Sequence, residues 1–166
     1  GIAVPGNKHP KVTERINKIK LEDFNFSGRP CTFWDLYGEN GLPIRATISE
    51  VGPVLLSRIL DLNSTQSDIL HMAFKFADDE GLLLLDLKDL REIFKNMAAN
   101  SKELQGDYGN ISKVSVGAIQ RKLITLQEAG GENFFNEPGL DLNHIMQCDF
   151  SGMGVINILD ATKLMN

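Results

Sequence analysis

One stretch near the C-terminus carries oxygen-bearing side chains at the spacing that calcium-binding loops use. Residues 149–160 read DFSGMGVINILD. A twelve-residue EF-hand loop would place Asp149 at position 1, Ser151 at position 3 and Asp160 at position 12, with a glycine at position 6. Met153 at position 5 offers no oxygen ligand, and Asp is shorter than the usual bidentate Glu at position 12. A turn that leads into a buried strand is the favoured interpretation, and a calcium site at these residues is the alternative.

The sequence offers no standard phosphate or zinc site. A Walker A loop needs G-x-x-x-x-G-K-[ST], because its backbone amides and its Lys hold the phosphates. No Gly-Lys dipeptide occurs in the chain, and no G-x-G-x-x-G occurs either. The three histidines and two cysteines are scattered, without the clustering that zinc requires. We therefore expect no cofactor and no metal in this chain, apart from the calcium alternative.

Two arginines are candidates for charge that is presented to a neighbouring subunit. Arg45 lies in LPIRATI and Arg121 lies in YGNISKVSVGAIQRKL. An arginine supplied in trans can stabilise the charge of a phosphoryl-transfer transition state. A surface side chain or a salt-bridge partner is the alternative for both, since arginine is mostly exposed. No nucleophile, metal or cofactor set can be assembled, so no residue is assigned a catalytic role.

Three adjacent carboxylates lie near the predicted end of a helix, at Asp78, Asp79 and Glu80. Negative charge is unfavourable at a helix C-terminus because the helix dipole is negative there. A solvated helix end explains the cluster, and its position hints at an ion pair with a Lys or Arg.

Length and composition indicate one compact domain over residues 1–166. Of the 166 residues, 42% are hydrophobic and 23% are charged, which is enough to build a core. The net charge of -5 disfavours tight non-specific binding to nucleic acid, although a local basic face is compatible with it. No disulfide framework, signal peptide or membrane-spanning run is seen, so a cytoplasmic protein is expected.

The elements that would position these residues are mainly helices. Apolar residues at helical spacing, together with capping residues and glycines, predict six helices. They cover 10–20, Ser49 to about Asn63, Ser64 (as the cap) to Gly81, Asp86 to about Asn100, Ser112 to Gly130, and a short segment after Asp141. The inward stripes are predicted at Leu55, Leu56, Ile59 and Leu60; at Ile69, Met72, Ala73 and Phe76; at Leu90, Ile93, Phe94 and Met97; and at Val116, Ile119, Leu123 and Leu126.

A small β component accompanies the helices. The aromatic run 31–37, the turn GENG and the segment 42–48 predict a hairpin, in which Pro43 restricts the second strand to an edge. GVINIL at 154–159 predicts a buried strand, and residues 160–166 resemble the start of a helix. The expected fold class is α+β, mainly helical.

Four long strings together resemble one family, the HerA-like P-loop ATPases of bacteria, which are described as helicases of the YjgR type. The resemblance covers nearly the whole chain. The strings are FWDLYGENGLPIRATISEVGPVLLSRILDLN (33–63), FADDEGLLLLDLKDLR (76–91), YGNISKVSVGAIQRKL (108–123) and GVINILDATKLM (154–165).

The resemblance implies that the chain is an internal piece of a larger ATPase, between the Walker A and Walker B elements, both of which it lacks. It implies a helical insertion between two strands of a RecA-like core, with 154–159 as the strand that re-enters that core. ATP and Mg would belong to the parent protein. A hexamer and a nucleic-acid substrate are implied by analogy. A stand-alone module that binds protein or DNA is the alternative function.

Overall fold

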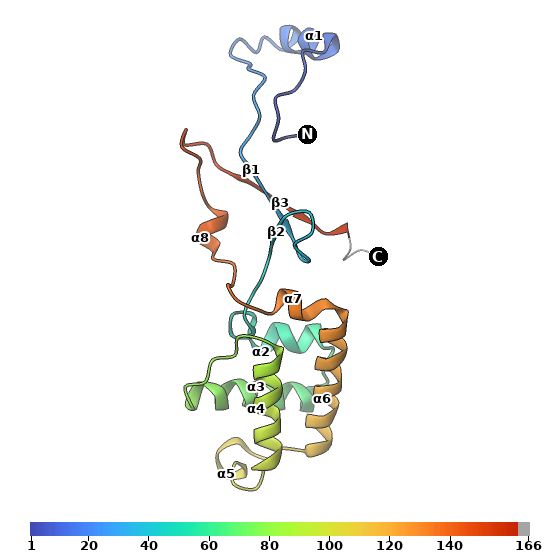
Figure 1. Ribbon diagram of the computed structural model, residues 1–166, viewed down its shortest axis with the longest axis vertical. Coiled ribbons are helices and arrows are strands. Elements are labelled where there is room, and N and C mark those ends of the chain that lie inside the picture. Colours follow the sequence, from blue (N-terminus) through green and yellow to red (C-terminus); the bar gives the residue numbers. More distant parts are fainter. Residues whose placement is uncertain (163–166) are drawn as a thin grey trace. The chain divides into compact units, whose positions relative to one another are not determined.

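The computed structural model describes residues 1–162 and confirms a mainly helical α+β fold (Figure 1). The chain forms two compact units: one contains Gly1–Leu42 and Asp141–Asn166, and the other contains Pro43–Leu140. The second, which we call the helical unit, is therefore inserted in the sequence of the first, which we call the strand unit. The helix start predicted over 160–166 lies, from residue 163 onward, outside the described residues. The expectation of one domain over 1–166 stays a prediction.

The helical unit contains four helices of twelve residues or more. They are α2 (Ile48–Ile59), α3 (Ser64–Asp79), α4 (Leu87–Ala99) and α6 (Lys113–Leu126). The short helices α5 (Gln105–Tyr108) and α7 (Glu132–Phe134) come after α4 and α6, with a π turn at Gln127–Gly131. The helices predicted from Asp86 and Ser112 begin as expected, because each of these side chains accepts a hydrogen bond from the first turn.

Helix α3 begins differently from the prediction. Its cap is Asn63, whose side chain accepts from the Gln66 backbone N–H at 2.9 Å, while Gln66 accepts from the Asn63 N–H. Ser64 is therefore the first helical residue and not the cap. Asn and Ser are both common N-cap residues. Asn63 is the cap here because it forms a reciprocal pair of hydrogen bonds with Gln66, three residues further on.

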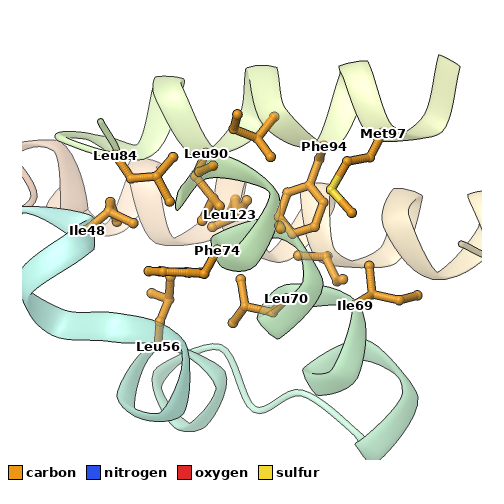
Figure 2. Packing of buried hydrophobic residues seen from close by; sticks show 14 of the residues in the cluster. Ile48, Leu56, Ile69, Leu70, Phe74, Leu84, Leu90, Phe94, Met97 and Leu123 are labelled. Carbon is orange, nitrogen blue, oxygen red and sulfur yellow. The ribbon is translucent and has the colours of Figure 1, made fainter. Parts of the chain in front are cut away.

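The core of the helical unit is apolar and closely packed (Figure 2). The predicted stripe on α4 is confirmed, since Leu90, Ile93, Phe94 and Met97 are all buried. Side chains of α3 and α6, including Leu70 and Leu123, pack against this stripe, and Leu56 of α2 joins the same core from the side of α3. The further buried apolar residues of this cluster are Ile48, Leu60, Ile69, Ala73, Phe74, Phe76, Ala77, Leu84, Leu87, Ile111, Val116, Ile119 and Phe135.

The stripe predicted on α2 is only half right. Leu56 and Leu60 are buried, but Leu55 and Ile59 are 53% and 52% exposed. The helix is kinked at Gly52, whose φ is +70°, and only one side of the helix beyond this kink packs on α3. Leu55 and Ile59 lie on the other side of the helix and stay exposed within this unit, although their apolar character predicted burial.

The two chain segments that enter and leave the helical unit are bonded to each other. Ala46 donates its N–H to the Phe134 carbonyl at 2.9 Å, and Leu140 donates to the Arg45 carbonyl at 2.8 Å. We call residues 45–46 and 134–140 the neck. At Gly139 in the neck, an added Cβ would collide with the carboxylate of Glu50, which would have to move.

The strand unit holds a small sheet and two short helices. Its elements are α1 (Pro10–Lys18), β1 (Cys31–Asp35), α8 (Leu142–Ile145) and β3 (Ile156–Asp160), and β2 (Leu42–Pro43) lies at the boundary with the helical unit. The strand order is β2-β1-β3, and β1 and β3 are parallel with Cys31 opposite Ile156 and Asp35 opposite Asp160. The helices predicted at 10–20 and after Asp141 are confirmed.

The predicted hairpin is wrong in its second strand, which stops at Pro43 instead of running to residue 48. Pro43 has no N–H to donate, and Thr47 ends any strand by capping α2. Its hydroxyl accepts from the Glu50 N–H at 3.2 Å, and Glu50 accepts from the Thr47 N–H at 2.8 Å. The main partner of β1 is instead β3, far away in the sequence.

The predicted strand at 154–159 is confirmed with bounds Ile156–Asp160, but it is half-buried and not buried. It lies at one end of the described sheet, and Leu159 is 48% exposed. Asn157 anchors it: its carbonyl oxygen accepts from the Trp34 indole at 2.8 Å, and its amide donates to the Ile145 carbonyl at 2.8 Å. One polar side chain therefore connects β1, β3 and α8.

Candidate functional site

Two carboxylates lie side by side at the carboxyl ends of the parallel strands. Asp35 is the last residue of β1 and Asp160 the last of β3, and the register places them opposite each other. The carboxyl ends of parallel strands are where open α/β sheets bind ligands. Asp35 could not be singled out from the sequence, because it pairs with a residue 125 positions further along the chain and no local pattern signals that pairing.

The Asp35 carboxylate organises the turn after β1. It is 5% exposed and accepts from the backbone N–H groups of Tyr37, Glu39 and Asn40 at 3.1, 2.8 and 2.9 Å. Three such bonds converge on one carboxylate from the residues that follow the strand. Asp35 is thus a structural acceptor for the turn at 36–40.

The environment of Asp160 is more exposed and favours its ionised form. The Thr162 hydroxyl and backbone N–H donate to it and hold its pKa below the usual value, against the raising effect of burial and of the Asp35 charge. This arrangement places Asp160 with Asp35 and Thr162, at the end of β3.

Asp149 and Ser151 form a separate turn ahead of β3. One oxygen of Asp149 accepts from the Ser151 hydroxyl at 2.6 Å, the Ser151 N–H at 2.9 Å and the Met153 N–H at 3.0 Å. The bond from the Ser151 hydroxyl lowers the pKa of Asp149 most, and the two backbone bonds lower it further. The pKa therefore stays below its usual value, although partial desolvation raises it. An isolated antiparallel β-bridge between the backbones of Cys148 and Gly154 closes the turn.

The three residues of the calcium alternative are therefore not brought together around one loop. Asp149 and Ser151 bind the turn's own donors, and Asp160 belongs to a strand paired with β1. Within residues 1–162, no group of three or more His, Cys, Asp or Glu side chains is placed to hold a metal ion. Calcium binding by Asp149, Ser151 and Asp160 stays a prediction that this geometry does not favour.

Arg45 is anchored in the neck. Its guanidinium donates to the Glu137 carbonyl at 2.8 Å, and its Nε is buried without a hydrogen-bond partner among the residues that the structure describes. The side chain is half-buried. This position ties the two segments of the neck together, which favours the structural interpretation of Arg45 over charge presented to another subunit.

Arg121 is exposed on α6. Within the described part of the chain its guanidinium makes no ion pair and no hydrogen bond, and it lies over Gly117, whose added Cβ would be 3.8 Å from Nη1. A charged group held on a helix and open to solvent can meet a partner. Of the two arginines, Arg121 fits the trans-acting role better, and that role stays a prediction.

The acidic cluster at the end of α3 has the cationic partner that its position suggested. Lys75 pairs with Asp79 at 2.8 Å, and the Tyr108 hydroxyl donates to the other Asp79 oxygen at 2.8 Å. The Tyr108 ring also packs edge-on against Phe76 with centroids 5.6 Å apart. The bonds from Lys75 and Tyr108 lower the pKa of Asp79, and the bond to Asp79 raises the pKa of Tyr108 to about 12.

Titration of Tyr108 should report this contact. We expect its phenolate to form near pH 12. The measurement is the difference in absorbance at 295 nm between wild type and Y108F as the pH is raised. The variant D79N should lower the pKa of Tyr108 toward 10. The raised pKa means that the hydrogen bond stabilises the fold below about pH 10, the unfolded value, and is lost as the pH rises toward 12. D78N, which removes a neighbouring carboxylate that Tyr108 does not bond, is the control. A D79N phenol that still titrates near 12 would contradict the assignment.

No helix in the described residues combines the length and apolar character needed to cross a membrane.

Comparison with known proteins gives one match. The model of the family described as helicase HerA-like C-terminal matches residues 1–166. No curated protein matches the chain, and no solved structure matches it. Since the family model spans both units, the resemblance noted in the sequence is confirmed. The chain belongs to the helicase HerA-like C-terminal family.

Proposed function

We propose that this chain is an accessory region of a larger HerA-like motor protein and that ATP is hydrolysed by other parts of that protein. The observation that carries the proposal is the family match over 1–166 in a sequence without a Gly-Lys dipeptide. The residues present do not supply a standard P-loop, because the chain has no Gly-Lys dipeptide and no glycine-rich phosphate cradle of that type. ATP and Mg²⁺ are therefore assigned to the parent protein alone.

The topology supports an insertion between two strands of the motor's sheet. β1 and β3 are parallel neighbours, and the sequence between them contains the whole helical unit. Parallel sheets in proteins are large and covered on both faces, and an edge strand leaves a row of N–H and C=O groups unpaired. β3 lies at the edge of the three described strands. We infer that further strands of the motor pair with β3.

The helical unit would then be an independently packed part of the parent protein. Its core is closed by its own helices, and the neck bonds its two connections together. Such a body can contact a neighbouring subunit of a ring, with the hexamer proposed by analogy, without disturbing the sheet. Arg121, exposed and without an ionic partner in the described residues, is the charge that we propose it presents.

In the full-length protein, R121A should lower ATPase turnover by roughly 10³-fold, which is the smallest effect typical of a trans-acting arginine. R121K should restore only part of the activity, because Lys lacks the planar fork of donors. The measurement is steady-state phosphate release, together with the assembly state by light scattering.

The matched control is R58A, which removes another exposed arginine of the helical unit. R58A should leave turnover unchanged. Unchanged turnover and assembly in R121A would remove the proposed role of Arg121. ATP hydrolysis by the isolated 166-residue chain would contradict the accessory function itself.

A further inference from the structure

The N-terminal part of the strand unit is strongly basic in an acidic chain. Residues 8–20 read KHPKVTERINKIK, with five Lys or Arg and a single carboxylate, Glu14. This segment therefore carries a net charge of +4, whereas the whole chain carries -5. The averaged charge conceals a local cationic surface, of the kind that binds polyanions.

Helix α1 arranges these cations in a line. Lys11, Arg15 and Lys18 are spaced i, i+4 and i+7, so they lie within an arc of about 60° on one face of the helix. The line is about 10 Å long at 1.5 Å per residue. All three are exposed, and α1 buries none of its residues. The net charge of the chain was compatible with a local basic face, and this spacing locates it.

The protein does not neutralise this face. Among the residues that the structure describes, the ion pairs involve Lys75, Lys88 and Lys95 only, and none of the cations of segment 8–20. The cations on α1 are therefore available to an external anion. An external partner could pair with these cations without breaking an ion pair within the described part of the chain.

We propose that the Lys11–Arg15–Lys18 face of α1 is a docking surface for the phosphate backbone of duplex DNA. One DNA strand carries a phosphate every 3.4 Å along the axis, so the line of about 10 Å can face about three phosphates. This partner rests on the proposed function, in which the parent is a HerA-like motor acting on nucleic acid. Helix α1 carries no aromatic side chain on which single-stranded bases could stack, which favours the duplex.

An anionic membrane is the other polyanion that basic amphipathic helices bind. It is disfavoured here because α1 has nine residues and its apolar side holds only Val12 and Ile16, with Ile19 just beyond its end. Membrane-surface helices usually bring large apolar residues such as Trp, Phe and Leu to the interface. None of these three types occurs in α1.

The test is fluorescence anisotropy of a labelled 25-base-pair duplex with the full 166-residue chain, at 50 and 200 mM salt. The variant K11Q/R15Q/K18Q keeps good helix formers and removes three charges. We expect it to bind at least about tenfold more weakly at 50 mM salt, with a salt slope smaller by about 2–3, as three lost phosphate contacts require. R58Q/K102Q/K113Q removes the same charge from exposed positions of the helical unit and should bind like wild type.

Any of four results would overturn the proposal: no binding by the wild type at 50 mM salt, equal losses in both triple variants, tighter binding to a single strand of the same length, or tighter binding to phosphatidylserine vesicles. Far-UV circular dichroism checks folding, and the single variant R15Q should weaken binding if the triple variant fails to fold. The assay contains no ATP, so a negative result leaves the accessory function to be judged by the ATPase measurement alone.

Discussion

Replacing Phe94 by Ala should lower the free energy of unfolding by about 3–5 kcal/mol, the usual cost of removing a buried aromatic ring. Phe94 lies on α4 and is completely buried, at the place where side chains of α3 and α6 meet the helix (Figure 2). The neighbouring helices are fixed by their own packing, so the space left by the ring cannot close fully. Domains are typically stable by about 5–15 kcal/mol, and this loss would leave the helical unit marginal.

The measurement is urea denaturation of the full chain, followed by far-UV circular dichroism. The matched control is Phe150→Ala, the same substitution at a fully exposed ring, which should change stability by less than about 0.5 kcal/mol. A similar loss in both variants would show that Phe94 does not carry the core.

The stripe that contains Phe94 was predictable because the periodicity of α4 is read within one helix. Leu90, Ile93, Phe94 and Met97 repeat at helical spacing, and Asp86 marks where the repeat begins. The same reasoning failed on α2, since burial there depends on which side meets α3. Sequence periodicity gives the apolar face of a helix, but the number of neighbours that cover this face is decided by the tertiary structure.

The sheet was less predictable for a similar reason. The aromatic run at 31–37 and the run at 154–159 each indicated a strand, and the short turn GENG indicated a hairpin. The stronger pairing, however, is between β1 and β3, across the whole helical unit. No local pattern encodes a parallel pairing at that distance along the chain. The Asp35–Asp160 pair, which depends on it, could therefore not be predicted from spacing.

The candidate interaction residues divide in the same way. Exposure of Arg121 agrees with its helical position away from Val116, Ile119 and Leu123, which α6 buries. Arg45 looked equivalent in sequence, but its neck contact with Glu137 is a tertiary feature. The cationic line on α1 required only the spacing of charges in one helix, so it was readable from the sequence once that helix was established.

Replacing Asp35 by Ala should lower the free energy of unfolding of the strand unit by about 3 kcal/mol, because hydrogen bonds to a charged group contribute more to stability than neutral ones. The backbone N–H groups of Tyr37, Glu39 and Asn40 would lose their acceptor in a turn that the carboxylate holds together. Fluorescence of Trp34, the only tryptophan and the residue before Asp35, reports unfolding of this unit.

The variant Asp35→Asn distinguishes the effect of the hydrogen bonds on stability from the effect of the negative charge. Asn keeps one acceptor oxygen and removes the negative charge that faces Asp160, so we expect it to cost less than Ala. The same change should lower the pKa of Asp160 further, because the Asp35 charge now raises it. The exposed Asp23→Ala is the control and should leave the unfolding midpoint unchanged. If Asp35→Ala unfolds at the midpoint of wild type, the turn at 36–40 is held by other contacts. The carboxyl ends of β1 and β3 would then be organised without the Asp35 carboxylate.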